Sequence, residues 1–255
     1  MLMALTREIS PAFESCQLTH VPRVPIDVER ARAQHAAYEW ALVEAGCTIR
    51  RLDTAPDLPD SVFIEDIAVV LEEGAIVCRP GAEARRAETA GVVEALVRHG
   101  RPLHRVQAPA TLDGGDVLVI GREVFVGASS RTNRAAIDQL SRTLGAVGYT
   151  VRAVPVRGCL HLKSAVTAVA ADTLLINRAW VPAETFRGLS LIDVDPEEPH
   201  AANGLTVGDA VIYPSSFPRT RERLERRGVR IRPVEVDELQ KAEGAVTCCS
   251  LIFEL

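Results

Sequence analysis

A cysteine pair near the C-terminus and one distant histidine form the strongest candidate for covalent chemistry in this sequence. Cys248 and Cys249 stand just before the apolar run Leu251–Phe253. His161 stands in a similar way before Ala165–Thr167, and such runs are typical of buried strands. Because imidazole exchanges a proton near neutral pH, a histidine beside a cysteine can make and use a thiolate. Neighbouring side chains of a strand face opposite sides, so one thiol at most faces a pocket, and we expect Cys248 to be that nucleophile.

Three carboxylates occupy similar places, at or within the start of an apolar run. Glu65 and Asp66 interrupt one such run, and Asp113 precedes another. Burying a carboxylate costs free energy unless a cation or several hydrogen-bond donors contact it. Glu65 and Asp66 are therefore expected either to lie at a solvated edge, to pair with an arginine, or to bind a cationic substrate. Such acids suit attack on a carbon that is already cationic, as in a guanidinium, whereas amide hydrolysis needs donors for an oxyanion. A substrate cation beside the thiol would also lower the pKa of Cys248. Asp113 is either a turn residue or the group that orients the imidazole.

Two arginines at predicted helix starts are candidates for binding a carboxylate. Arg85 lies at one start and Arg131 between a strand end and another start. A guanidinium can bind a carboxylate through two parallel hydrogen bonds, although most arginines are solvated. Arg86, the adjacent residue, competes with Arg85 for this role.

Ordinary alternatives stay open for the cysteines and the histidine. Free cysteines are often core residues, and a single histidine is often structural. A different class of protein is a metal-binding one, in which Cys159, His161, Cys248 and Cys249 supply tetrahedral ligands. Their spacing is unlike that of a standard zinc module, and we expect no native metal.

Composition favours one ordinary globular domain over residues 1–255. The chain is 47% hydrophobic and 25% charged, with only 4% aromatic residues, so its core must be mostly aliphatic. A net charge of −5 argues against nucleic-acid or anionic-membrane surfaces and mildly favours a cationic ligand. The N-terminal residues lack a signal-peptide pattern, no stretch is long enough to cross a membrane, and the six cysteines show no disulfide framework. We therefore expect a cytoplasmic protein with reduced thiols.

The elements needed to position these groups follow from periodicity and turn residues. The predicted helices cover 28–45, 83–98, 133–144, 218–227 and 237–242. Single strands are predicted at 4–9, 47–52, 103–107, 149–156, 189–194 and 229–234. Hairpins are predicted at 62–71 with 75–78, 116–120 with 123–127, 164–170 with 173–177, and 204–207 with 210–213. Residues 10–26 are expected to form a long loop of the kind that often acts as a lid.

These elements repeat as hairpin, helix or loop, and strand, which indicates a modular α/β fold. Corresponding points lie at Asp66, Asp116, Ser164, Asn203 and Cys249, with spacings of 50, 48, 39 and 46 residues. The last module has one strand, and its hairpin partner must be residues 4–9. Pairing of the two chain ends would close a ring and bring the strand starts together at its centre. The alternative is one open α/β sheet.

Several longer segments resemble the dimethylarginine dimethylaminohydrolase family, within the guanidino-group-modifying superfamily. The segments that carry the resemblance cover the chain in order and are Leu58–Asp66, Arg79–Gly81, Thr111–Leu118, Ser130–Asn133, His161–Ser164 and Thr247–Ser250. The resemblance implies a five-bladed α/β propeller of ββαβ modules with pseudo-fivefold symmetry. It also implies hydrolysis of N-omega-methylated arginines to citrulline and a methylamine, with no obligatory cofactor and a small cationic amino acid as the bound partner.

By motif position, the resemblance also assigns roles. Cys248 would be the nucleophile, His161 the general acid and base, and Asp113 the group orienting that histidine. Glu65 and Asp66 would hold the guanidinium. The residues implied for the amino-acid end of the substrate are Asp60, Arg85, Arg131 and, from the lid loop, Leu18. Cys249 would be structural.

The implied reaction passes through a covalent thiouronium on Cys248. A related enzyme acting on arginine, agmatine or citrulline is the alternative within the same superfamily. The methylation preference of the substrate and the oligomeric state, a homodimer included, stay open at this stage.

Overall fold

Five small sheets of three strands each make up the frame of the computed structural model, which describes residues 1–255. In each sheet the middle strand pairs antiparallel with one neighbour and parallel with the other. Four sheets are continuous in sequence: β3 (Ala68–Leu71), β4 (Gly74–Val77) and β5 (Leu103–Arg105); β6 (Val117–Ile120), β7 (Glu123–Ala128) and β8 (Thr150–Pro155); β9 (Val166–Ala170), β10 (Thr173–Ile176) and β11 (Ser190–Asp193); β12 (Leu205–Val207), β13 (Ala210–Pro214) and β14 (Ile231–Val234). The hairpin-and-strand modules predicted from the sequence are thus confirmed.

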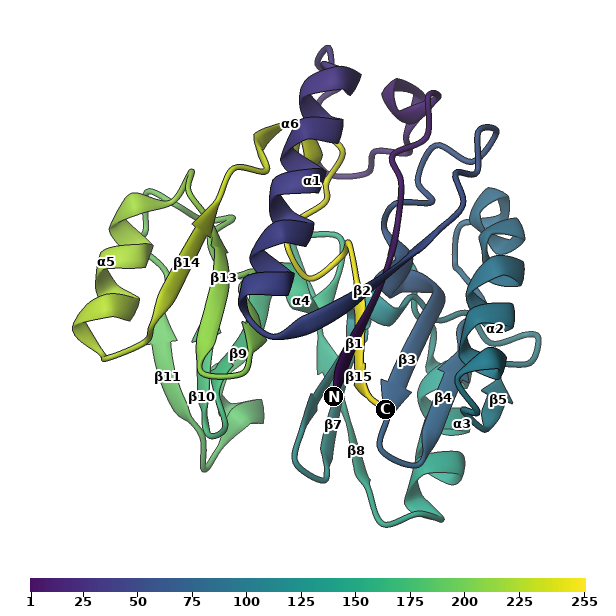
Figure 1. Cartoon of the computed structure of the whole chain (residues 1–255). Coiled ribbons are helices and arrows are strands. Elements are labelled where there is room, and N and C mark those ends of the chain that lie inside the picture. Colours follow the sequence, from purple (N-terminus) through teal and green to yellow (C-terminus); the bar gives the residue numbers. More distant parts are fainter.

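The fifth sheet joins the two ends of the chain. It contains β15 (Leu251–Glu254), β1 (Leu2–Arg7) and β2 (Cys47–Leu52), in that order. The first two strands are antiparallel, from Leu2 opposite Glu254 to Leu5 opposite Leu251. Both termini therefore lie side by side (Figure 1). The predicted pairing of the terminal strands is confirmed.

The first strands of all five sheets line one common cavity of ≈ 330 Å³. They are β3, β6, β9, β12 and β15. Separate sheets around a shared space exclude the alternative of one open sheet. The polar segments in front of these strands are therefore carried towards one region of the molecule.

The α-helices are α1 (Val28–Glu44), α2 (Thr89–Arg98), α3 (Arg134–Gly145), α4 (Leu162–Ala165), α5 (Pro218–Arg226) and α6 (Asp237–Gln240). The helices α1, α2, α3 and α5 pack on the outer sides of the sheets, whereas α4 lies among the sheets near the centre of the molecule (Figure 1). The 3-10 helices are η1 (Phe13–Ser15), η2 (Ile64–Ile67), η3 (Glu83–Glu88), η4 (Gly114–Asp116) and η5 (Ala183–Phe186). The predicted cap of α1 is present, because Asp27 accepts the N–H of Arg30 at 3.0 Å. No helix has both the length and the apolar character needed to span a membrane.

Several sequence-based boundaries are wrong. The strand predicted at 4–9 is Leu2–Arg7. The predicted helix over 83–98 is split into η3 and α2. The strand predicted from residue 62 begins only at Ala68, because η2 precedes it, and similar single turns precede β6 and β9. An extended strand would turn Glu65 and Asp66 to opposite faces, whereas a helical turn lets both stay buried and reach different partners.

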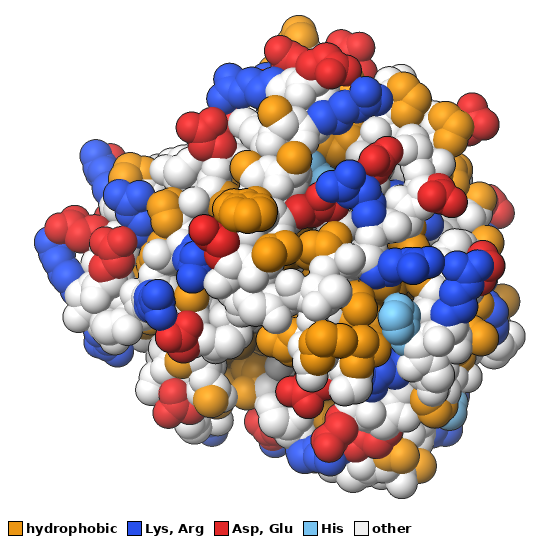
Figure 2. Space-filling model, viewed as in Figure 1, with side chains coloured by type: hydrophobic (Ala, Val, Ile, Leu, Met, Phe, Trp, Pro, Cys, Tyr) orange, Lys and Arg blue, Asp and Glu red, His pale blue; other side chains and the backbone are white.

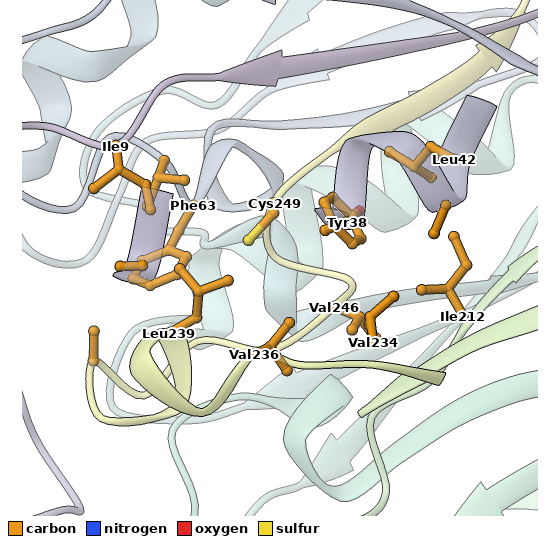
Figure 3. Packing of buried hydrophobic residues seen from close by; sticks show 14 of the residues in the cluster. Ile9, Tyr38, Leu42, Phe63, Ile212, Val234, Val236, Leu239, Val246 and Cys249 are labelled. Carbon is orange, nitrogen blue, oxygen red and sulfur yellow. The ribbon is translucent and has the colours of Figure 1, made fainter. Parts of the chain in front are cut away.

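The largest hydrophobic cluster joins α1 to the segment before β15 and to the lid loop. Cys249 lies in this cluster, between Tyr38 and Phe63 (Figure 3). The fully buried phenol of Tyr38 finds its hydrogen-bond partner in the Ser250 hydroxyl at 2.7 Å. This packing anchors the C-terminal strand on α1. On the outer surface, charged side chains of both signs intermingle (Figure 2).

Candidate active site

Cys248 lies in a turn in front of β15, where its backbone is held from two sides. Its carbonyl accepts the N–H of Glu65 at 3.0 Å. The N–H of the preceding residue, Thr247, donates to Asn203 Oδ1 at 3.1 Å. Cys249 is fully buried in the large core cluster, and of the two neighbouring cysteines only Cys248 lines the cavity beside His161.

His161 stands at the N-cap position of α4, between two carboxylates. Its Nε2 lies 3.1 Å from Asp113 Oδ2, and its Nδ1 lies 3.7 Å from Asp66 Oδ1. Burial alone would lower the pKa of His161, but Asp66, Asp113 and Asp116 outweigh it and raise that pKa to about 9. The imidazole is therefore protonated at neutral pH and can donate a proton.

Asp113 is fully buried and is itself fixed by the backbone. Its Oδ1 accepts the N–H of Gly81 at 2.8 Å, while its own N–H donates to Thr132 Oγ1 at 3.2 Å. Only Oδ2 is left for the imidazole of His161. The carboxylate therefore sets the orientation of the ring.

Asp66 faces a cation inside the protein. Its Oδ2 lies 2.5 Å from Arg85 Nη1, and its Oδ1 accepts the N–H of Gly115 at 3.0 Å. Burial raises the pKa of Asp66, but His161 and Arg85 outweigh it, and the net shift is downward. The carboxylate is therefore ionised, as the partner of a cation must be.

Arg85 is only 5% exposed and uses its remaining donors on Glu88 and on the carbonyls of Asp60 and Phe63. It lines the same cavity as Asp66. Arg86, by contrast, pairs with Glu83 and does not line that cavity. The structure thus separates the two adjacent candidates by location.

Glu65 was predicted to hold the substrate together with Asp66. It does not line the cavity that is lined by Asp66, Arg85 and Cys248. Its Oε1 accepts Lys163 Nζ at 2.5 Å and its Oε2 accepts the Thr247 hydroxyl at 2.8 Å. Glu65, Lys163 and Thr247 instead line the cavity shared by the five sheets. The physical reason is the nearby lysine, a cation that periodicity could not place.

The lid loop covers the site and is tied to it by backbone donors. The N–H of Gln17 donates to both oxygens of Asp60, at 3.1 and 3.3 Å. Glu243 accepts the N–H groups of Thr19, His20 and Val21 at 2.6, 2.5 and 3.1 Å, respectively. Together these contacts hold the loop in a closed position.

Arg131, predicted to bind the amino-acid end of the substrate, and Leu18, predicted to close over it from the lid loop, differ in position. Arg131 lines the cavity, and its Nη2 donates to Thr19 Oγ1 at 3.1 Å. Leu18 is partly buried against the large core cluster and does not line the cavity. Its neighbour Gln17 does.

The cavity itself has a volume of ≈ 20 Å³, which is room for about one water molecule. Cys248, His161, Asp60, Asp66, Arg85 and Arg131 are among its lining residues. Six of the nine predicted site residues therefore meet at one small space. Asp113 supports it from behind, while Glu65 and Leu18 lie outside the lining.

The thiol of Cys248 is neutral in this setting. Burial raises its pKa, and the carboxylates of Glu65 and Asp66 raise it further, to about 12. A thiolate would therefore need an added positive charge next to the sulfur.

A metal site made of cysteines is not assembled. The acidic and histidine side chains that could offer ligand atoms within 4.8 Å of one another are Asp66, Asp113 and His161, without any cysteine. Asp66 already faces the guanidinium of Arg85. The four-residue Cys–His alternative from the sequence is therefore not supported by the geometry.

Sequence reasoning assigned no role to Lys163 or Glu243, although both contact the site region. Lys163 stands two residues after His161, within a segment quoted for its resemblance. Glu243 has a φ of +58°, a region disfavoured for this residue type, which only coordinates reveal. Its disfavoured backbone conformation and its three contacts with backbone N–H groups indicate that Glu243 holds the loop over residues 10–26 in place.

Comparison with known proteins decides the family. A family model described as N,N dimethylarginine dimethylhydrolase, eukaryotic, matches residues 23–254. The chain belongs to the dimethylarginine dimethylaminohydrolase family. As a member of this family, it is a hydrolase.

Relatives in this family match over nearly the whole chain. The dimethylarginine dimethylaminohydrolase of Streptomyces coelicolor is 44% identical over 250 residues, covering 97% of this chain and 95% of that protein. The Pseudomonas aeruginosa enzyme, crystallised with citrulline as a variant with serine in place of a cysteine, superposes with a TM-score of 0.93 at 32% identity, and the match covers 98% of each chain. A variant of a family member with glycine in place of a histidine, as an adduct with S-methyl-L-thiocitrulline, superposes with a TM-score of 0.92 at 32% identity, covering 98% of this chain and 99% of that one.

Proposed function

We propose that this chain hydrolyses N-omega-methylated arginines, namely asymmetric dimethylarginine and monomethylarginine, to citrulline and dimethylamine or methylamine. The observation that carries the proposal is the meeting of Cys248, His161 and Asp66 at one cavity, with Asp113 behind the imidazole. A nucleophile, a proton donor and an anion are the groups that attack on a guanidinium carbon requires. The citrulline complex of the similar Pseudomonas aeruginosa protein supports the product.

The charges around the cavity match the two ends of such a substrate. Asp66, with Glu65 behind it, would hold the guanidinium, and Asp60, Arg85 and Arg131 would bind the amino-acid end. Asp66 Oδ2 and Arg85 Nη1 lie 2.5 Å apart and neutralise each other. A methylated arginine carries a cation for the first and a carboxylate for the second, so it would replace this internal ion pair. Leu18 would close over it from the lid.

The reaction begins when the substrate cation lies beside Cys248 and the thiol passes its proton to solvent water, because a positive charge lowers the thiol pKa. The thiolate attacks the guanidinium carbon, and protonated His161 gives its proton to the departing amine. A covalent thiouronium and a neutral imidazole result. His161 then takes a proton from water and the hydroxide adds to the same carbon. The carbon–sulfur bond breaks, the hydroxyl proton passes to the departing sulfur, and citrulline leaves with the Cys248 thiol and protonated His161 restored. Chain, substrate and water supply every group in these steps.

Access of substrate would require the lid to open, because a cavity of ≈ 20 Å³ cannot hold an arginine side chain. The contacts of Thr19, His20 and Val21 with Glu243 would break in that movement. Backbone hydrogen bonds to one partly exposed carboxylate are suited to repeated opening, since water can replace them.

The proposal also includes the architecture. The five sheets around a common cavity, with β1 and β15 paired, support a five-bladed propeller with pseudo-fivefold symmetry. Residues 1–255 would form a single catalytic domain. The substrate would reach it at the end where the lid loop lies.

A substrate panel tests the proposal. Citrulline and released amine are measured with asymmetric dimethylarginine, monomethylarginine, arginine and agmatine, and we expect turnover of the methylated arginines to dominate. Cys248→Ser should abolish turnover while keeping the circular dichroism spectrum, and Cys249→Ala serves as the neighbouring-thiol control that keeps it. Preference for arginine or agmatine would favour another guanidino hydrolase, and full activity of Cys248→Ser would overturn the mechanism.

A further inference from the structure

Arg7, the last residue of β1, is a buried cation without a partner. It is 4% exposed, and neither its Nε nor its Nη1 has a hydrogen-bond partner. Buried guanidinium groups are normally paired, because losing water without gaining an acceptor is costly. The mechanism proposed above makes no use of this residue.

The acid that influences Arg7 most strongly is already engaged elsewhere. Glu88 accepts three hydrogen bonds from Arg85, at 2.8, 3.0 and 3.2 Å. Burial lowers the pKa of Arg7, and the charge of Glu88 offsets this only in part. The carboxylate that serves the active site therefore leaves Arg7 without an ion pair.

Gly91 in α2 makes room for this arginine. A Cβ at this position would lie 2.7 Å from Arg7 Nη2, closer than real contacts allow. Glycine is the least favoured residue of a helix after proline. Glycine at this position therefore lets α2 pack closely against the unpaired guanidinium.

Arg7 faces a pocket of ≈ 240 Å³ between β2 and α2. Four arginines line it (Arg7, Arg50, Arg51 and Arg98) together with His99, against two carboxylates, Asp53 and Glu94. Figure 2 shows Lys and Arg side chains gathered beside a histidine at the right of this face. Around this pocket the balance is positive, whereas the chain as a whole carries −5.

The other pocket cations differ in how far they are neutralised. Arg98 pairs with Glu94 at 2.6 Å, and Arg51 pairs with Glu39 and Glu8. Arg50 is exposed and, like Arg7, forms no ion pair. Arg7 at the base and Arg50 at the rim thus carry no ion pair. The Nε and Nη1 atoms of Arg7 are themselves buried, which leaves its Nη2, next to Gly91, to face the pocket.

We propose that this pocket binds a small phosphate-type oxyanion, with the Arg7 guanidinium as its main ligand and Arg50 at the rim. The Nη2 group of Arg7 can donate to one phosphate oxygen and Arg50 to another, and a dianion neutralises two unpaired arginines at once. The volume also accommodates the organic part of a phosphate monoester. This pocket shares no lining residue with the cavity at Cys248, so it is a second site.

Thermal unfolding in inorganic phosphate tests the proposal, with chloride keeping the ionic strength constant. For the intact protein, each tenfold rise in phosphate above its Kd should raise Tm by about 2–4 °C. Arg7→Met, which keeps the bulk and removes the charge, should unfold at an unchanged or higher Tm without phosphate and show no phosphate dependence. Arg152→Met on β8, an exposed arginine paired with Glu123, is the matched control and should respond like the unaltered chain.

A second variant keeps the test decisive if Arg7→Met folds poorly. Gly91→Ala retains the arginine but places a methyl group against Nη2, and we expect phosphate affinity by calorimetry to fall at least tenfold. Glycerol phosphate binding ten times more tightly than phosphate would assign a monoester as the ligand, and equal binding would assign free phosphate. The same phosphate dependence in Arg7→Met, or an equal effect of chloride, would overturn the proposal. Because every readout is binding, the result does not depend on the proposed turnover.

Discussion

Lys163 Nζ lies 2.5 Å from Glu65 Oε1, so a lysine of the protein itself neutralises the charge of this buried carboxylate. The side chains are 17% and 9% exposed, where water screens little. The second oxygen of Glu65 is bound to Thr247, the residue before the proposed nucleophile. The ion pair therefore lines the cavity shared by the sheets, and its carboxylate is hydrogen-bonded to the residue that precedes Cys248.

Removal of this lysine should leave a buried carboxylate without its cation. We expect Lys163→Met to lower the free energy of unfolding by about 3 kcal/mol, the range for breaking a buried pair. Arg134→Met, which breaks the exposed pair with Asp138, is the control and should cost less than about 1 kcal/mol. Urea unfolding at pH 7 measures both. Equal losses would mean that the Lys163–Glu65 pair is no more sheltered than a surface pair.

The raised pKa of His161 predicts a pH dependence of stability. Its pKa is about 9 in the folded protein and about 6.5 when unfolded. The protonated form is favoured by folding, so this stability is fully present below about pH 6.5 and is lost as pH rises towards 9, by up to about 3 kcal/mol. Urea unfolding between pH 6.5 and 7.5, where the cysteines of the unfolded chain stay mostly protonated, measures the first part of this loss.

His161→Gln should flatten that pH dependence, because the titrating group is gone. The exposed His104→Gln is the control and should keep the slope of the unaltered chain. A slope that survives in His161→Gln would assign the titration to another group.

Asp113→Asn should impair proton transfer more than substrate binding. The amide can still accept the N–H of Gly81, but it presents no charge to His161. We expect kcat to fall about 10²- to 10³-fold with KM changed less than threefold. The basic limb of the kcat–pH profile should also move to lower pH, since Asp113 is one of the groups that raise the pKa of His161. A change confined to KM would contradict an orienting role.

The contacts of Glu243 predict how the lid opens. Glu243→Ala removes the acceptor for three backbone N–H groups, so hydrogen exchange at Thr19, His20 and Val21 should become at least tenfold faster. The KM for the methylated arginine should rise by a larger factor than kcat falls, because the closed loop contributes to substrate binding rather than to the chemical step. Glu14→Ala, in the same loop, is the control. Unchanged exchange rates at these amides would show that other contacts hold the loop.

Much of the framework was readable from the sequence. The cap of α1 at Asp27, the hairpins and the pairing of residues 4–9 with the last strand came from turn residues, alternation and repeat spacing. These signals are local or periodic, and each module must bury its own apolar face, so the chain carries them in every repeat. The segments that resemble the family likewise contain Cys248, His161 and Asp66, so these residues could be singled out from the sequence.

Only the tertiary structure decided which charges meet. Glu65 is 98 residues from Lys163, and Glu243 is more than 220 residues from the lid amides that it binds. No periodicity encodes such pairs, because they depend on how separate modules turn their loops towards each other. The same holds for Arg7, which has no partner because the nearby Glu88 pairs with Arg85. The sequence by itself determined the repeated elements and the reactive residue types, while long-range packing determined which of these side chains are neutralised inside the protein and which are left to bind a ligand.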